Sequence, residues 1–569
     1  MRMLTTWAWI VLTLALASGA AAAKEPAIRT QAAFHDLSLL VAPELPCYWT
    51  AGFPPFDINH YLRIGPLSAY NSDILTIDEH TGTQFDAPAH FVPPPDSGLP
   101  DASPLGLVTG EKVPAWQFCG EACVIDCSDM LESGPAGISP LITRDRVRAW
   151  EKSHRPLKAG DVVLFRSGYT DKFYAPFPQG RRLIADPVQG TAPGWPDPDA
   201  ACMDYLASRG VMTLGTDSPS MGPIPGDLAP RVHVAGLKHG MIWTECGTRY
   251  GQLPATGAFY CMVGVKHAGS SGSEGRAFAI EPGSLAERLN AASRQHQVVD
   301  LSVTLSEDFP VSWPGAGTGN HRCPYYNKVI NNFGKGGPYL AQTHRMDSHS
   351  GTHLVPPAYA LPAEGFDSSN YAPEVQEWLA EYEKKFGPRG LSDVTTEKVP
   401  LEQTCGEARV IDVSSLVGST DNSAWPASPE ITAEQIEAWE SQHGPLQAGD
   451  VVLFRSGYSD RHYLPMPEGN SCLKLPLDGQ AEGWPAPGAA AIQLLAKRGI
   501  RCVGTDGPTL GGVDPRRALF TYWQLASQGM VGVEYLTNLD QVPDKAYFIF
   551  AAVKIRGCHG GPGRAIALY

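Results

Sequence analysis

Apolar runs and amphipathic stretches alternate along this chain. The runs at 162–166 and 451–455 both read VVLFR, a short apolar and β-branched pattern that is typical of a buried strand. Four stretches carry apolar residues at helical spacing, namely 144–154, 200–210, 433–443 and 490–499. A glycine ends the second and the fourth of these, and an apolar run ending in Gly-Thr-Asp follows each. Helix followed by strand, repeated, predicts a layered α/β fold.

The whole pattern occurs twice. The segment AGDVVLFRSGY stands at 159–169 and again, without a change, at 448–458. Trp150 and Trp439 share the same spacing of 289 positions. So long a period indicates a duplicated domain and not a solenoid of short repeats. We expect domains at 28–285 and 296–569, joined through a short polar helix near SLAERLNAASRQHQ.

The N-terminal stretch MRMLTTWAWIVLTLALASGAAAAKEPA has an early arginine, an apolar run and a small-residue end. This pattern predicts a cleaved signal peptide over residues 1–23 and a secreted or periplasmic protein, with a membrane anchor as the alternative. No later apolar run has the roughly 18 residues of a membrane span, so we expect no membrane association after cleavage.

Composition narrows the classes of partner. The net charge is −15 and basic residues do not cluster, which argues against nucleic acid as a partner. The 12 cysteines are scattered without a CxxC zinc pattern. We expect a mixture of buried thiols and a few disulfides.

The first candidate for chemistry is HTGTQFDAPAH, His80 to His90. Gly82, Thr83 and Pro88 disfavour a helix, and in an extended chain the even positions share one face. That face would carry His80, Gln84, Asp86 and His90. Imidazole with carboxylate suits Zn, Mn or Fe, whereas a solvated polar surface is the alternative interpretation.

The motif resembles the HxGTHxDxPxH signature of the cyclase family, which includes bacterial kynurenine formamidases and isatin hydrolases. The resemblance extends through GDVVLFRSGY, the Gly-Thr-Asp segments and the tract from Glu534 to Pro543. It implies an α/β fold with two tandem cyclase-like (swivelling β/β/α) domains. Family members also form dimers whose pockets border the neighbouring protomer, so the duplicated chain is expected to form an intramolecular pseudo-dimer.

By the same resemblance, the first half holds an intact metal site for a divalent metal, Zn or Mn, as one or two ions. His80, Gln84 and Asp86 form its first part, and His233 and Glu245, twelve positions apart, complete it. His90 is either a further ligand or the proton-transfer group, and we assign it as the general base because imidazole titrates near neutral pH. Gln84 stands where the signature has His, and an amide oxygen is a weaker ligand.

The second half repeats the motif in damaged form, as HSGTHLVPPAY. His349, His353 and Glu534 persist as a degenerate second site. The positions equivalent to Asp86, His90 and His233 hold Val355, Tyr359 and Tyr522. We expect one active half whose pocket the other half helps to build; the alternative is that the second half binds a ligand of its own.

Together these features predict a secreted, metal-dependent hydrolase that cleaves a C–N amide bond, in an aryl formamide or a cyclic amide. The alternatives are a noncatalytic metal- or small-molecule-binding protein, and a lyase or cyclase acting on a carbonyl substrate. The expected partner is a small aromatic amide, and the expected assembly is a monomeric pseudo-dimer or a homo-oligomer. Aromatic side chains that either wall the substrate or fill the core are Phe85, Phe91, Trp195 and Trp243. Arg276 recurs as Arg564, which favours a structural role for both.

Overall fold

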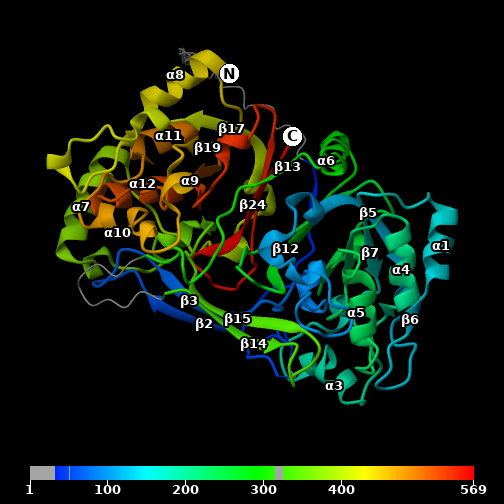
Figure 1. The fold of residues 1–569 in the computed structure, drawn as a ribbon. Helices are drawn as coiled ribbons and strands as arrows, with labels where there is room; N and C mark the ends of the chain where they lie inside the picture. Colours follow the sequence, from blue (N-terminus) through cyan, green and yellow to red (C-terminus); the bar gives the residue numbers. More distant parts are fainter. Residues whose placement is uncertain (1–31, 50–51, 314–323) are drawn as a thin grey trace, which may run out of the picture.

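The computed structural model describes residues 32–49, 52–313 and 324–569, and it shows two similar lobes side by side (Figure 1). The expected signal peptide, residues 1–23, lies outside the described residues. The predicted tandem α/β architecture is confirmed, because each lobe repeats the same arrangement of strands and helices.

In the first half, eight strands form one sheet that closes on itself, because β12 pairs with both β11 and β4. Its strands, in spatial order, are β1 (Phe34–Asp36), β12 (Gly272–Ile280), β11 (Phe259–Gly264), β5 (Cys119–Asp126), β7 (Asp161–Arg166), β9 (Thr213–Thr216), β10 (Ile242–Glu245) and β4 (Gln84–Asp86). The helices are α1 (Arg144–Ser153), α2 (Tyr169–Phe173), α3 (Ala185–Val188), α4 (Ala200–Ser208), α5 (Ala229–Leu237) and α6 (Ser284–Arg294). Strands β5, β7, β9 and β10 run parallel.

The second half repeats this closed sheet. Its strands, in spatial order, are β13 (Val298–Asp300), β24 (Gly561–Leu568), β16 (His353–Val355), β22 (Val531–Glu534), β21 (Cys502–Thr505), β19 (Val451–Arg455), β17 (Cys405–Asp412) and β23 (Tyr547–Ala552). Its helices are α7 (Pro373–Phe386), α8 (Ala433–His443), α9 (Tyr458–His462), α10 (Lys474–Leu477), α11 (Ala489–Lys497) and α12 (Pro515–Ser527). Two short pairs complete the halves: β6 (Leu141–Ile142) with β8 (Asp197–Pro198), and β18 (Glu430–Ile431) with β20 (Ala486–Pro487).

The predicted elements form for the reasons that their sequences suggest. Along β7, Val162 and Leu164 face the inside of the closed sheet, whereas Val163 and Phe165 pack under the helices. Both faces are buried, which is why the strand is uninterruptedly apolar. Helix α8 begins with a capping box in which Thr432 and Gln435 exchange hydrogen bonds.

A four-stranded sheet joins the two halves at the base of Figure 1. Its order is β14 (Tyr326–Asn332), β15 (Leu340–Asp347), β3 (Ser72–Asp78) and β2 (Asp57–Leu62). The central pairing is antiparallel between β3 of the first half and β15 of the second, with Ile77 opposite His344. Each half therefore sends a hairpin to the other, and the chain forms the expected intramolecular pseudo-dimer.

Two matched ion clusters also link the halves. Asp36 accepts Arg276 of its own half at 2.9 Å and contacts Lys554 of the other half at 2.6 Å. The pseudo-symmetric Asp300 contacts Arg564 at 2.7 Å and Lys266 at 2.9 Å. The recurring arginines thus have the structural role that their repetition favoured.

We expect Asp36→Asn to lower the free energy of unfolding at pH 7 by about 2 kcal/mol, the usual worth of hydrogen bonds to charged groups. Burial alone would raise the pKa of Asp36, but Arg276 and Lys554 outweigh it and hold the pKa below its usual value. The stabilisation is therefore complete above the unfolded-state pKa of about 3.9 and is lost as pH falls through the lower folded-state pKa.

Urea denaturation of the wild type and of Asp36→Asn at pH 7 and at decreasing pH measures this difference. The two curves should converge in acid. Asp129→Asn is the matched control, because Asp129 also pairs with an arginine, Arg146, but on the surface. A stability difference that stays constant with pH would contradict the linkage.

Two further features concern membrane-spanning helices and cysteine pairing. Across residues 32–49, 52–313 and 324–569, no helix is both long and apolar enough to cross a membrane. The eleven cysteines in these ranges are all buried and unpaired, so the expectation of a few disulfides is wrong for this part of the chain. Cys323 lies outside the described residues.

Candidate active site

The motif from His80 to His90 bends more than an extended chain does. Only Gln84–Asp86 form a strand, β4, while residues Pro88–His90 form a 3-10 helix that begins at proline. Gly82 turns the chain before the strand at φ +64°, where a Cβ would meet Val41. The expectation of one extended face is wrong, and the side chains converge because turns flank a short strand.

Strand pairing places the acidic half of the site. β4 runs antiparallel to β10, with Gln84 opposite Glu245 and Asp86 opposite Trp243. The Gln84 amide donates to Glu245 Oε2 at 2.8 Å, and Trp243 Nε1 donates to Asp86 Oδ2 at 3.0 Å. Sheet register therefore fixes both carboxylates, and it brings together residues that lie more than 150 positions apart in the chain.

Three imidazoles surround the Asp86 carboxylate. His80 Nδ1 lies 3.2 Å from Oδ1, and His233 Nε2 and His90 Nε2 lie 3.5 and 3.8 Å from Oδ2. His233 stands on α5 and is also 3.7 Å from Glu245 Oε1. All six residues singled out in the first half are therefore buried together around one point.

Burial and charge shift the protonation of these groups in opposite directions. Burial alone would raise the pKa of Asp86, but the neighbouring His90, His233 and His80 hold it well below its usual value. Burial lowers the pKa of His90 to about 3, so this ring is neutral at physiological pH. His233 has a pKa of about 9, because Asp86 and Glu245 outweigh its burial. The Asp86 carboxylate thus stays ionised beside the neutral His90 imidazole.

The donor set fits a divalent cation. Gln84 Oε1 is buried without a hydrogen-bond partner, a costly state that a cation relieves, and Asp86 Oδ1 makes no hydrogen bond of good geometry although His80 Nδ1 lies 3.2 Å away. Ligand atoms lie within 4.8 Å of one another in two sets that share Asp86. One set is His80, Asp86 and His90, and the other is Asp86, His233 and Glu245. Imidazole and carboxylate ligands suit Zn or Mn, and the shared Asp86 allows one or two ions.

The second half completes this site with residues that sequence reasoning missed. His90 Nδ1 lies 2.8 Å from the Leu340 carbonyl oxygen at the start of β15. The Tyr339 ring lies 5.9 Å from His90 and stacks on Phe53 at 6.1 Å. Nothing in the motif points to Tyr339 or Leu340. They reach the site only because the β14–β15 hairpin of the second half crosses to the first half.

A second missed residue is Glu79, directly before His80 in the chain. Its buried carboxylate accepts the Ser271 hydroxyl and the Gln342 backbone N–H, the latter at 3.0 Å. Ser271 Oγ in turn lies 3.1 Å from His80 Nε2. Glu79 and Ser271 thus orient the His80 ring, as carboxylates behind metal-binding imidazoles often do. The one feature of the sequence that could have pointed to Glu79 is that it directly precedes His80.

The sequence model of the Cyclase family matches residues 35–223 and 299–511, more than half of the chain and parts of both halves. The chain belongs to the Cyclase family. The isatin hydrolase of Roseibium aggregatum is 28% identical over 283 residues, which cover 48% of this chain and 93% of the relative. The kynurenine formamidase of Erythrobacter litoralis is 28% identical over 213 residues, 37% of this chain and 78% of the relative.

Solved structures show a similar coverage. Isatin hydrolase A from Labrenzia aggregata, bound to benzyl benzoate, is 28% identical with a TM-score of 0.36, covering 48% of this chain and 93% of that one. Isatin hydrolase A from Ralstonia solanacearum is 24% identical with a TM-score of 0.38, covering 50% and 97%. Each relative thus spans about one cyclase domain of this chain.

The site of the second cyclase domain is filled by tyrosines. Tyr522 donates to Glu534 Oε1 at 2.5 Å, in the place where His233 faces Glu245. The Tyr359 ring lies tilted beside His349, with centroids 4.5 Å apart, and Tyr70 of the first domain stacks on Tyr359 at 4.7 Å. Phenol rings therefore stand at the positions that the His90 and His233 imidazoles hold in the first domain.

The surviving polar groups of the second domain are close but incomplete as a metal site. His353 Nε2 lies 3.2 Å from Glu534 Oε2, and His349 contacts Asp347 at 3.4 Å. Among the described residues, none of the sets of three His, Cys, Asp or Glu side chains close enough to hold an ion includes His349, His353 or Glu534. Val355 supplies no carboxylate between them.

The aromatic candidates divide between core and site. Phe85, Trp195 and Trp243 are fully buried in hydrophobic clusters, so they do not wall a pocket. Phe91 lies at the site, with its ring 4.2 Å from His233 and 5.8 Å from Tyr339. Trp243 instead holds the Asp86 carboxylate in place, through the hydrogen bond that its Nε1 donates.

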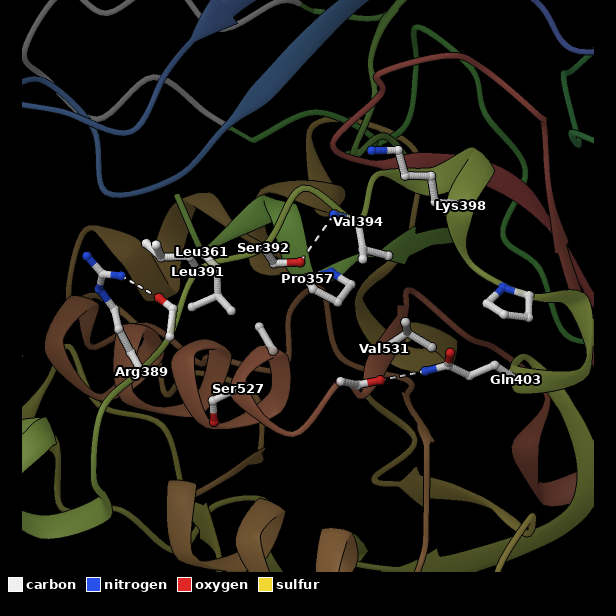
Figure 2. A pocket seen from close by; sticks show the side chains of 14 residues that line it. Pro357, Leu361, Arg389, Leu391, Ser392, Val394, Lys398, Gln403, Ser527 and Val531 are labelled. Carbon is white, nitrogen blue, oxygen red and sulfur yellow. Dashed lines mark hydrogen bonds between the residues drawn. The ribbon is translucent and has the colours of Figure 1, made fainter. Parts of the chain in front are cut away.

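A cavity of about 400 Å³ opens in the second domain beside α12 (Figure 2). Its lining includes Pro357, Arg389, Lys398 and Val531. No imidazole or carboxylate lines it, so it lacks metal-ligating groups, and it meets the motif of the second half only at Pro357.

Proposed function

We propose that this protein is a metal-dependent hydrolase that cleaves a C–N amide bond at the site of its first cyclase domain. One observation carries the proposal: the ionised Asp86 lies fully buried among three imidazoles and belongs to both sets of ligand-type atoms around it. A folded chain tolerates such a group when a cation is its partner. The names of the relatives, isatin hydrolase and kynurenine formamidase, support an amide as substrate.

The metal would be held by His80, Gln84, Asp86, His233 and Glu245, with Zn or Mn as the candidates. A divalent ion there supplies a Lewis acid that polarises the carbonyl and lowers the pKa of water toward 7. Glu245 is fixed for this role by the Met221 backbone N–H at 2.5 Å and by Gln84. The oxygen of Gln84 replaces the imidazole of the family signature.

His90 is placed to move a proton. Its Nδ1–H donates to the Leu340 carbonyl, which leaves the Nε2 lone pair facing the Asp86 side of the site. A neutral imidazole in this tautomer has a lone pair that can accept a proton from the attacking water and return it to the departing nitrogen. Because burial lowers the pKa of His90 to about 3, this role rests on the position and tautomer of the ring and not on the near-neutral titration from which it was first assigned. Leu340 belongs to the second domain, so the second domain would set the tautomer of the base.

The aromatic surroundings favour a flat substrate. The Phe53 ring lies 6.3 Å from His80, and the Phe91 and Tyr339 rings lie 4.6 and 5.9 Å from His90. Rings of this kind contact an aryl formamide or a fused cyclic amide over its face. We therefore propose a small aromatic amide as the substrate.

We also propose the cellular setting and the organisation of the chain. Residues 1–23 would be a cleaved signal peptide, and the mature protein would be secreted or periplasmic. The two cyclase domains would span 28–285 and 296–569. Since the pseudo-dimer already supplies both walls of the site, a monomer would be sufficient for activity, although a homo-oligomer is compatible with it.

The activity test pairs metal removal with a substrate panel. We expect the mature protein to hydrolyse an N-formyl aryl amine or an isatin-like cyclic amide, to lose this activity on dialysis against a chelator, and to regain it with Zn or Mn. Mass spectrometry should show one water taken up: a cyclic amide gives a single product heavier by one water, and an N-formyl aryl amine gives the free aryl amine and formate, whose masses sum to substrate plus water. A metal-loaded protein that binds these amides without turnover would instead favour a binding protein, and a product without added water would favour a lyase or cyclase.

A further inference from the structure

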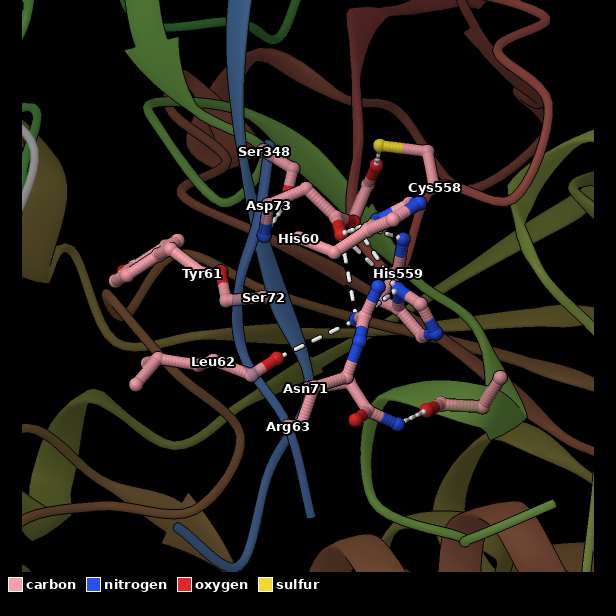
Figure 3. A network of polar contacts seen from close by, with 12 residues as sticks. His60, Tyr61, Leu62, Arg63, Asn71, Ser72, Asp73, Ser348, Cys558 and His559 are labelled. Atoms are coloured by element: carbon pink, nitrogen blue, oxygen red, sulfur yellow. Dashed lines mark hydrogen bonds and ion pairs between the residues drawn. The ribbon is translucent and has the colours of Figure 1, made fainter. Parts of the chain in front are cut away.

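A second cluster of ligand-type side chains lies between the two domains, apart from the site around Asp86 (Figure 3). His60 on β2 contacts Asp73 on β3, with Nδ1 to Oδ1 at 2.6 Å. His559, in the loop between β23 and β24, places Nδ1 3.1 Å from Asp73 Oδ2. The ligand atoms of all three residues lie within 4.8 Å of one another.

The fold itself does not require these residues. The repeat aligns His60 with Val329 and Asp73 with Gln342, which are register partners on β14 and β15. It aligns His559 with Ser271, whose hydroxyl bonds to Glu79. At the pseudo-symmetric positions the apolar Val329 and the neutral Gln342 and Ser271 thus take the places of His60, Asp73 and His559, so the same backbone forms without these ligand-type side chains.

The cluster is buried at its base and open at its rim. The Asp73 side chain is 0% exposed, while that of His60 is 41% exposed. A cavity of about 370 Å³ opens beside His60 and His559. An ion can therefore reach the cluster from solvent, and the carboxylate at its base is held in place by the His559 backbone N–H at 2.6 Å.

Arg63 presently lies against the same groups. Its guanidinium is 3.3 Å from His559 Nδ1 and 3.5 Å from Asp73 Oδ1. The Arg63 side chain is 43% exposed, so it can turn into solvent. The Arg63 guanidinium would compete with a bound cation for Asp73, so removing this side chain should strengthen cation binding.

We propose that His60, Asp73 and His559 form a second divalent transition-metal site, of the zinc class, that bridges the two domains. Two imidazoles and one carboxylate are a common three-residue zinc ligand set, with the fourth position left to solvent. Ligand atoms around a tetrahedral zinc ion lie about 3.3 Å apart, and the observed separations are 2.6 Å, 3.1 Å and at most 4.8 Å, so each needs to change by no more than about 1.5 Å. Binding would tie β2 and β3 of the first domain to the β23–β24 loop of the second.

The test measures zinc binding to the mature protein carrying Asp86→Ala, which removes the first site. Equilibrium dialysis should find one zinc ion per chain. His559→Ala and, separately, the exposed His60→Ala should each weaken binding at least about tenfold, whereas Arg63→Ala should strengthen it. His443→Ala is the matched control, because His443 is an imidazole near Trp439 and outside the cluster.

Cobalt substitution provides an independent readout, since its visible absorption reports bound imidazole and carboxylate. The proposal is overturned if the Asp86→Ala protein binds no zinc. It is also overturned if His60→Ala and His559→Ala bind zinc as tightly as their parent. Circular dichroism of each variant confirms that its fold is kept, and His60→Ala provides the result if the more buried His559→Ala does not fold.

Discussion

Asp86→Asn is expected to lower kcat/KM by at least about 10³-fold and to release the metal of the first cyclase domain. Asp86 belongs to both sets of ligand atoms, and the Lewis acid that it would hold contributes several kcal/mol to the barrier. Asparagine keeps the size of the side chain and an oxygen for the Trp243 donor, so the sheet register should persist. Steady-state kinetics and metal content of the purified variant measure both effects.

The second domain provides the matched control for this variant. His353 is the equivalent of Gln84, it is equally buried, and it lies beside Glu534 as Gln84 lies beside Glu245. His353→Ala should change kcat/KM by less than about threefold, because Val355 and the tyrosines leave no catalytic set around it. If His353→Ala were as damaging as Asp86→Asn, the assignment of activity to one domain would be wrong.

His90→Gln is expected to lower kcat by about 10²–10⁴-fold while the metal stays bound. This range is the usual contribution of a positioned general base. Glutamine preserves a donor toward the Leu340 carbonyl but offers no basic nitrogen on the other side. The pH–rate profile should lose its acid limb, because the group whose deprotonation is needed has been removed.

The tyrosine at the equivalent position of the second domain gives a control, since Tyr359→Phe alters the same 3-10 helix position without touching the first site. Two results would contradict the role of His90. A wild-type rate with an unchanged acid limb would remove it as the base, and loss of the metal together with the activity would make it a ligand.

The sequence predicted the repetitive and local features of this protein. Strand β7 and helix α8 follow from patterns that span fewer than a dozen residues, in which side-chain periodicity reports burial directly. The repeat identified the two domains, and Val355 at the position equivalent to Asp86 showed which of them keeps the ligand-type residues of the motif. The motif identified the candidate ligands that the fold brings together, although it did not predict the 3-10 helix that positions His90.

Only the tertiary structure decided the contacts between the halves. The Leu340 carbonyl meets His90 across 250 positions of sequence, and Lys554 meets Asp36 across more than 500. No local periodicity encodes such pairs, because they depend on how β3 and β15 pair. The amino-acid sequence therefore determined that one domain keeps the imidazoles and carboxylates of the family motif and the other has lost most of them. The pairing of the domains decided that the second domain contributes to the site of the first. It places the Tyr339 ring beside His90 and supplies the Leu340 carbonyl that accepts a hydrogen bond from His90.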